Sequence, residues 1–92
     1  MTRDTFEGVS SKGQEELVEA AHKVLAIMGT ILEERPKDGE IIAIVYGNHV
    51  TVDVIQVNLT TSKLRVKARK DMLPSLGVAQ EVYTKIMNQL EQ

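Results

Sequence analysis

The feature that most constrains this fold is the strict alternation of charged and apolar residues across residues 63–69. Side chains of a β-strand point to opposite faces in turn, so Lys63, Arg65, Lys67 and Arg69 share one face and apolar residues take the other. An antiparallel strand of this kind packs one face on a core and leaves the other in water. The chain is therefore expected to contain a sheet with one covered face.

Two further segments, Glu40–Tyr46 and His49–Asn58, are rich in the β-branched residues typical of strands. With Gly47-Asn48 as a two-residue hairpin connection, the facing pairs are Val45 with Val50, Ala43 with Val52, and Ile41 with Val54. The opposite face then carries Ile42, Ile44, Tyr46, His49, Thr51 and Asp53. Apolar residues change face after Val54, which predicts a β-bulge near Val54-Ile55.

Amphipathic helices are predicted on both sides of these strands. Ser11 and Gln14 have the spacing of a capping box, and apolar residues then recur at helical steps up to a stop at Gly29. Ser75 is placed to cap a second helix over about residues 76–91. The strands are thus bracketed by two helices that each have an apolar face to bury.

The order of these segments predicts an α+β fold, an antiparallel β-meander of three to four strands with an N-terminal and a C-terminal helix packed on one face. Residues 30–35 can continue the first helix or form the fourth strand. Gly29 and the β-branched residues after it favour the strand. Residues 1–10 lack periodicity and are expected to be a flexible lead, which leaves 11–92 as a single two-layer domain.

Composition limits the partners that such a domain can have. The formal net charge of −2 argues against a general affinity for polyanions. Phe6, Tyr46 and Tyr83 are the only aromatic residues, too few for the stacking platforms of single-stranded nucleic-acid binders. Charge and composition therefore disfavour a nucleic-acid partner. No apolar run approaches the ~20 residues that span a bilayer, so no transmembrane segment is expected in this chain.

No motif in the chain has the spacing of a catalytic, metal or cofactor site. His22 and His49 are the only histidines and share no ligand spacing. The chain has no Cys, no G-x-S-x-G nucleophile motif and no glycine-rich phosphate loop. We expect a non-enzymatic protein with no catalytic residue, no metal and no cofactor.

Two groups of residues are candidates for a partner surface. The basic row, Lys63, Arg65, Lys67 and Arg69, is either an anion-binding surface or the solvated face of an edge strand that its charges protect from aggregation. The second group is apolar and lies on the face opposite the predicted core: Ile42, Ile44 and Tyr46. Either these three mark a protein interface, or a central strand tolerates exposed Ile for its β-propensity.

The whole pattern resembles the small bacterial envelope lipoprotein domains of unknown function, in which a helix ending in a Leu/Met-Gly step precedes a β-meander and a C-terminal helix. The resemblance covers about residues 14–91. It is carried by Ala26-Ile27-Met28-Gly29, Asp38-Gly39-Glu40-Ile41-Ile42-Ala43, His49-Val50-Thr51-Val52, Leu64-Arg65-Val66-Lys67 and Ala79-Gln80-Glu81-Val82.

This resemblance implies a periplasm-facing protein that is tethered through a lipid-bearing Cys upstream of residue 1. It supplies no catalytic residue. The expected function is an envelope-associated interaction or binding module, whose partner is another envelope protein or an anionic envelope component. The alternative is a cytoplasmic regulatory or nucleic-acid-binding module that uses the basic strand 63–70.

Overall fold

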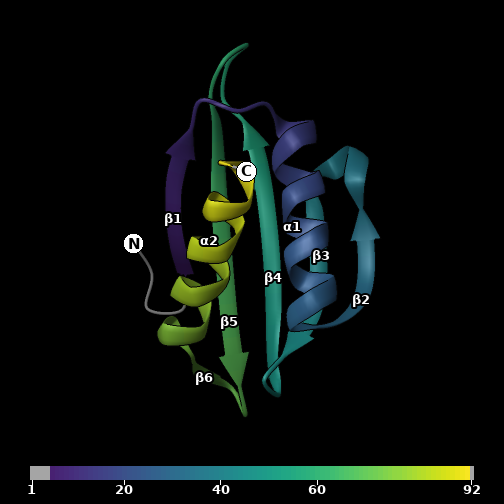
Figure 1. Cartoon of the computed structure of the whole chain (residues 1–92). Helices are drawn as coiled ribbons and strands as arrows, with labels where there is room; N and C mark the ends of the chain where they lie inside the picture. The colour runs from purple at the N-terminus through teal and green to yellow at the C-terminus, as the bar shows by residue number, and fades with distance from the viewer. Residues whose placement is uncertain (1–4, 92) are drawn as a thin grey trace.

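In the computed structural model, which describes residues 5–91, the chain forms a six-stranded antiparallel sheet with both helices on one face (Figure 1). The strands lie in the order β1-β5-β4-β3-β2, and β6 pairs with the far end of β5. The elements along the chain are β1 (Thr5–Ser10), α1 (Gln14–Met28), β2 (Gly29–Arg35), a 3-10 turn (Pro36–Asp38), β3 (Glu40–Val45), β4 (Asn48–Gln56), β5 (Ser62–Lys70), β6 (Leu73–Pro74) and α2 (Leu76–Leu90).

The prediction of three to four strands is wrong, because β1 and β6 add to the sheet on the outer side of β5. Residues 5–10, assigned to a flexible lead, form β1 and pair along β5. Phe6 holds this strand to the helix layer through an edge-to-face contact with Tyr83 of α2, with ring centroids 4.9 Å apart. Residues 1–4 of the predicted lead lie outside the described residues.

Both helices and the strand at residues 30–35 are confirmed, but the capping box is not. Gly13 occupies the N-cap position of α1 without a side-chain cap. The backbone N–H of Gln14 instead donates to the side-chain oxygen of Gln56 on β4, at 2.9 Å. The Gln14 side chain donates to the carbonyl of Val54, also at 2.9 Å. The start of α1 is therefore fixed by β4 rather than by its own sequence.

The β3–β4 hairpin turns one residue earlier than predicted. Val45 pairs with Asn48, so the two-residue loop is Tyr46-Gly47, with φ of 53° and 77°. Asn48 is buried, and its side-chain amide donates to the carbonyls of Val45 and Tyr46 at 3.2 and 3.1 Å. This places the turn before Asn48. Because the pairing shifts by two residues, each side chain stays on the face that the alternation predicts.

The predicted bulge near Val54-Ile55 is absent, since the pairing of β4 with β5 is continuous from His49 to Gln56. The register shift lies in β2 instead, between Ile31 and Glu33. The apolar residues after Val54 remain exposed on a β4–β5 hairpin that projects beyond the body of the domain (Figure 1). At its tip, Leu59 is 99% exposed.

The core fills the space between the sheet and the helices with aliphatic side chains. α1 lies over β3 and β4, while α2 lies over β5 and β1 (Figure 1). Residues that are completely buried in both layers include Leu17, Leu25, Val82 and Ile86 from the helices, and Val45, Val50, Val52, Leu64 and Val66 from the sheet. The other face of the sheet, which no helix covers, is called the open face below.

Candidate functional site

The basic row lies on an interior strand rather than at an edge. β5 pairs with β1 on one side and with β4 on the other, so its backbone is already protected from pairing with other chains. The explanation that the row guards an edge strand is therefore wrong. The row instead follows the second strand of the sheet along the open face, and the side chains of Lys63, Arg65, Lys67 and Arg69 are exposed or half-buried.

Cross-strand pairing places one of these four cations in a belt of charges that crosses the sheet. Arg65 lies opposite Glu7 of β1 and Asp53 of β4, and Asp53 lies opposite Glu40 of β3, which faces Arg35 of β2. Arg65 Nε is 3.0 Å from a Glu7 carboxylate oxygen, and Arg35 Nη1 is 3.1 Å from Glu40. We call these five residues the charge belt. Arg65 thus pairs with a carboxylate of its own sheet within the charge belt.

Below the charge belt, toward the β3–β4 turn, the open face combines basic and apolar groups. Lys67 lies opposite Thr51, which lies opposite Ile42. In the next row with outward side chains, Arg69 lies opposite His49, which lies opposite Ile44. We call this area the mixed patch: Lys67, Arg69, His49, Thr51, Ile42 and Ile44. Adjacent strands are about 4.8 Å apart, so its cations and its isoleucines are separated by about 10 Å.

Tyr46, predicted on the open face beside Ile42 and Ile44, belongs to the other side of the molecule. Its position in the turn takes it out of the strand alternation, and its hydroxyl donates to the carboxylate of Glu81 on α2 at 2.7 Å. This hydrogen bond, with desolvation and the charge of Glu81, raises the pKa of Tyr46. Ile42 and Ile44 do lie on the open face and are half-buried there.

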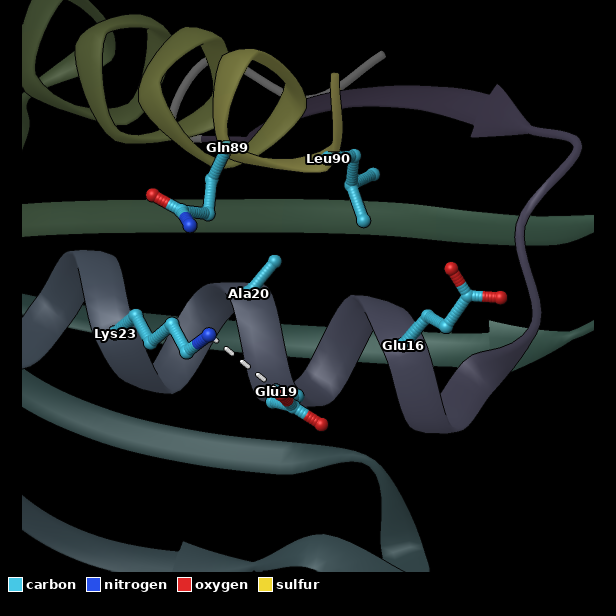
Figure 2. Close-up of a pocket in the computed structure, with 6 residues that line it drawn as sticks. All are labelled: Glu16, Glu19, Ala20, Lys23, Gln89 and Leu90. Carbon is cyan, nitrogen blue, oxygen red and sulfur yellow. Dashed lines mark ion pairs between the residues drawn. The ribbon is translucent and has the colours of Figure 1, made fainter. Parts of the chain in front are cut away.

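A hollow lies beside Tyr46 on the helix side. It has a volume of about 530 Å³ and is bounded by Ile27, Tyr46, Glu81 and Lys85, among others. A second hollow lies between α1 and α2 and measures about 190 Å³. Figure 2 shows Ala20 and Leu90 facing each other across it, with the Glu19–Lys23 ion pair at its rim. Each is an open surface depression, and polar or charged residues make up most of its lining.

The titratable residues within residues 5–91 do not assemble a metal site. No group of three His, Cys, Asp or Glu side chains comes together in that range. His22 Nδ1 contacts a Glu34 carboxylate oxygen and so links α1 to β2. His49 lies on the opposite face of the sheet, next to Arg69. The two histidines are thus separated by the core. Nor is any helix between residues 5 and 91 long and apolar enough to cross a bilayer.

The alternation of residues 63–69 identified the basic row correctly, but the charge belt needed the structure. Two of its members, Glu7 and Arg35, lie in strands at opposite edges of the sheet. Glu7 falls in the segment that appeared unstructured from sequence. The ion pair between Arg65 and Glu7 was therefore missed.

No protein-family model matches the chain, and no curated protein is similar to it in sequence. Among solved structures, the fold is similar to that of StfQ, a di-domain ARO/CYC (aromatase/cyclase) protein from the steffimycin biosynthetic pathway. The TM-score is 0.64 at 6% sequence identity, and the match covers 94% of this chain and 43% of StfQ. The chain therefore spans less than half of that protein, and the likeness establishes a shared fold alone.

Proposed function

We propose that this chain is a non-enzymatic binding module, and that the mixed patch on its open face recognises a partner protein segment with both acidic and apolar residues. The observation that carries the proposal is the position of Lys67 and Arg69 on an interior strand, about 10 Å from two half-buried isoleucines. Neither the edge of the sheet nor the core requires this arrangement.

Each half of the mixed patch selects for a different property of the partner. Carboxylates placed over Lys67 and Arg69 gain charge-assisted hydrogen bonds. Apolar side chains placed over Ile42 and Ile44 remove these two residues from water. This burial stabilises the complex by about 25 cal/mol for each Å² of apolar surface buried. Thr51 and His49, between the two halves, offer polar groups to a backbone that crosses the strands.

The charge belt supports a protein partner over a nucleic acid. Glu7, Asp53 and Glu40 place carboxylates directly above the mixed patch, where a phosphate backbone that follows the basic row would meet them. A long polyanion needs an uninterrupted positive surface. A short acidic segment fits below the belt without meeting these carboxylates.

An envelope location is part of the same proposal, and its support is the resemblance of residues 14–91 to envelope lipoprotein domains. The test is fractionation of cells that express the native gene, followed by protease treatment of intact spheroplasts. Envelope placement predicts that the protein sediments with membranes and is cleaved from the outside. Recovery in the soluble cytoplasmic fraction would favour the regulatory alternative.

Fluorescence anisotropy with two labelled peptides tests the binding surface. One peptide interleaves Glu with Leu, and the other has Ser in place of each Leu. We expect the first to bind more tightly, and binding to weaken with salt. Lys67→Gln should reduce the affinity by about two- to fivefold, the range for exposed charge pairs. Ile44→Ser should reduce affinity for the first peptide only.

Lys23→Gln is the matched control, because Lys23 is an exposed lysine on α1, on the far side of the molecule. It should leave both affinities unchanged. Equal losses in Lys67→Gln and Lys23→Gln would show that binding follows overall charge, and would contradict the assignment to the mixed patch. A preference for single-stranded DNA over both peptides would instead favour the nucleic-acid alternative.

A further inference from the structure

One end of the domain gathers several exposed apolar residues, and it adjoins the mixed patch at Arg69. At this end α1 stops, the β3–β4 hairpin turns at Tyr46-Gly47, and the β5–β6 hairpin turns at Asp71-Met72 (Figure 1). We call it the lower end, as Figure 1 draws it. Met72 is 86% exposed and Leu73 68%, while Ile27 at the end of α1 is 84% exposed.

The β5–β6 turn has an unusual residue at its tip. Lys70 pairs with Leu73, so Asp71 and Met72 form the two-residue loop, and both have positive φ, 51° and 67°. Such a loop favours Gly or Asn, because a side chain in the left-handed region costs about 1 kcal/mol. Met72 thus carries a conformational cost while its side chain lies in water. Strained positions of this kind concentrate at functional sites.

Two basic residues, Arg69 and Lys70, lie next to this apolar tip. Arg69 Nη2 donates to the carbonyl of Met72 at 2.7 Å, which braces the turn from the end of the basic row. Lys70 flanks the turn, and its ammonium lies 3.6 Å from where a Cβ on Gly47 would be. It therefore lies above the neighbouring β3–β4 turn. Two acidic residues also lie at this end. Asp71 is in the turn itself, and Glu81 accepts the hydrogen bond of Tyr46.

We infer that the lower end docks on an anionic lipid bilayer, with Met72 and Leu73 inserted among the headgroups and Lys70 at the level of the phosphates. Apolar side chains that project from a basic surface bind such membranes, through buried apolar area and attraction to anionic lipids. The inference goes beyond the proposed function and adds an orientation. With the strands upright on the membrane, the open face stays accessible to a partner protein.

The upper end of the domain lacks this combination and provides the control. Leu59, at the tip of the β4–β5 hairpin, is even more exposed than Met72. Its neighbours Asn58, Thr60 and Thr61 are uncharged, and the Asn58 side chain accepts hydrogen bonds from the N–H and hydroxyl of Thr60 at 2.9 and 3.2 Å. An exposed leucine is therefore present at both ends, but only the lower end places it beside a lysine and an arginine.

Flotation of the protein with lipid vesicles tests the inference. We expect binding to vesicles of equal parts phosphatidylcholine and phosphatidylglycerol, and little binding to phosphatidylcholine alone. Leu73→Ser should weaken binding to the anionic vesicles about tenfold, the effect of exposing one partly inserted side chain. Lys70→Gln should weaken it about fivefold, the contribution of one lysine near an anionic surface. Leu59→Ser should leave it unchanged.

Met72→Gly separates membrane binding from folding. Asp-Gly is a preferred pair for this type of turn, so the variant should unfold at a temperature no lower than the original protein while binding vesicles less tightly. Equal binding to both kinds of vesicle, no binding to either, or equal losses in Leu59→Ser and Leu73→Ser would overturn the inference. If the protein fails to bind vesicles while Lys67→Gln still weakens peptide binding, the membrane inference is wrong and the proposed peptide-binding function stands.

Discussion

Replacing Gly8 with Ala tests whether β1 is an integral part of the domain. A Cβ at this position would lie 2.1 Å from the hydroxyl oxygen of Tyr83 and 3.0 Å from its Cζ. The Tyr83 ring crosses β1 there and packs on Phe6. An added methyl group must therefore displace α2's tyrosine or push β1 away from β5.

Overpacking of this kind typically costs about 1–3 kcal/mol. For a domain of this length each 1 kcal/mol lowers the unfolding temperature by about 4–8 °C. We expect Gly8→Ala to lower it by roughly 5–20 °C, as measured by circular dichroism during heating. If residues 5–10 were a flexible lead, the same substitution would be neutral or slightly stabilising. The sign of the change in unfolding temperature therefore distinguishes a packed β1 from a flexible lead.

Gly77→Ala is the matched control, because a Cβ on Gly77 meets nothing within 4 Å and the residue lies in the first turn of α2. It should stabilise the domain by about 0.5–1 kcal/mol. In a double-mutant cycle, Tyr83→Phe should recover part of the loss caused by Gly8→Ala, because it removes the clashing oxygen. A neutral Gly8→Ala, or losses that simply add, would refute the packing of β1 under Tyr83.

Three further predictions concern the core and the turns. Ile86→Ala should cost about 2–5 kcal/mol in denaturant titrations, because Ile86 is fully buried between the layers; a loss below 1 kcal/mol would contradict that burial. Gly39→Ala should destabilise by at least about 1 kcal/mol, because Gly39 has φ of 70° and its Cβ would lie 2.2 Å from the carbonyl oxygen of Val54; an unchanged unfolding midpoint would argue against this turn. Glu81→Ala should lower the pKa of Tyr46 toward 10.0, because the acceptor that raises this pKa is lost. Tyrosinate absorbance titrations on a Tyr83→Phe background, in which Tyr46 alone is observed, measure this pKa. An unchanged titration would show that the hydrogen bond to Glu81 does not form in solution.

Periodic patterns in the sequence predicted the centre of this fold well. The alternation in residues 63–69 and the β-branched runs before it gave the right strands and the right inward faces. The shift of the β3–β4 register by two residues left every side chain on its predicted face. The burial of alternate residues fixes which face each side chain takes more strongly than it fixes the position of the turn. The turn itself was missed because Asn48 is buried at the start of β4, where its amide donates to the carbonyls of Val45 and Tyr46, and the left-handed conformation falls on Tyr46 instead.

The edges of the sheet were harder to predict because they depend on contacts distant in sequence. β1 has an alternation too weak to identify a strand, and it is held by Phe6 against a tyrosine on the last helix. The start of α1 depends on Gln56, which lies 42 positions further along the chain. For the candidate site, the basic row was predicted, whereas the charge belt required knowledge of which strands are neighbours. The displacement of Tyr46 required the register of the β3–β4 turn.

Titration of isotope-labelled protein with the acidic, Leu-containing peptide, followed by amide chemical shifts, locates the binding surface residue by residue. The largest shifts are expected on the mixed patch, at Ile42 and Ile44 of β3 and at Lys67 and Arg69 of β5. The amides of α1 and α2 should stay unchanged, because the helices lie on the other side of the core. Shifts concentrated on the helices, or none up to saturating peptide, would contradict a binding site on the open face.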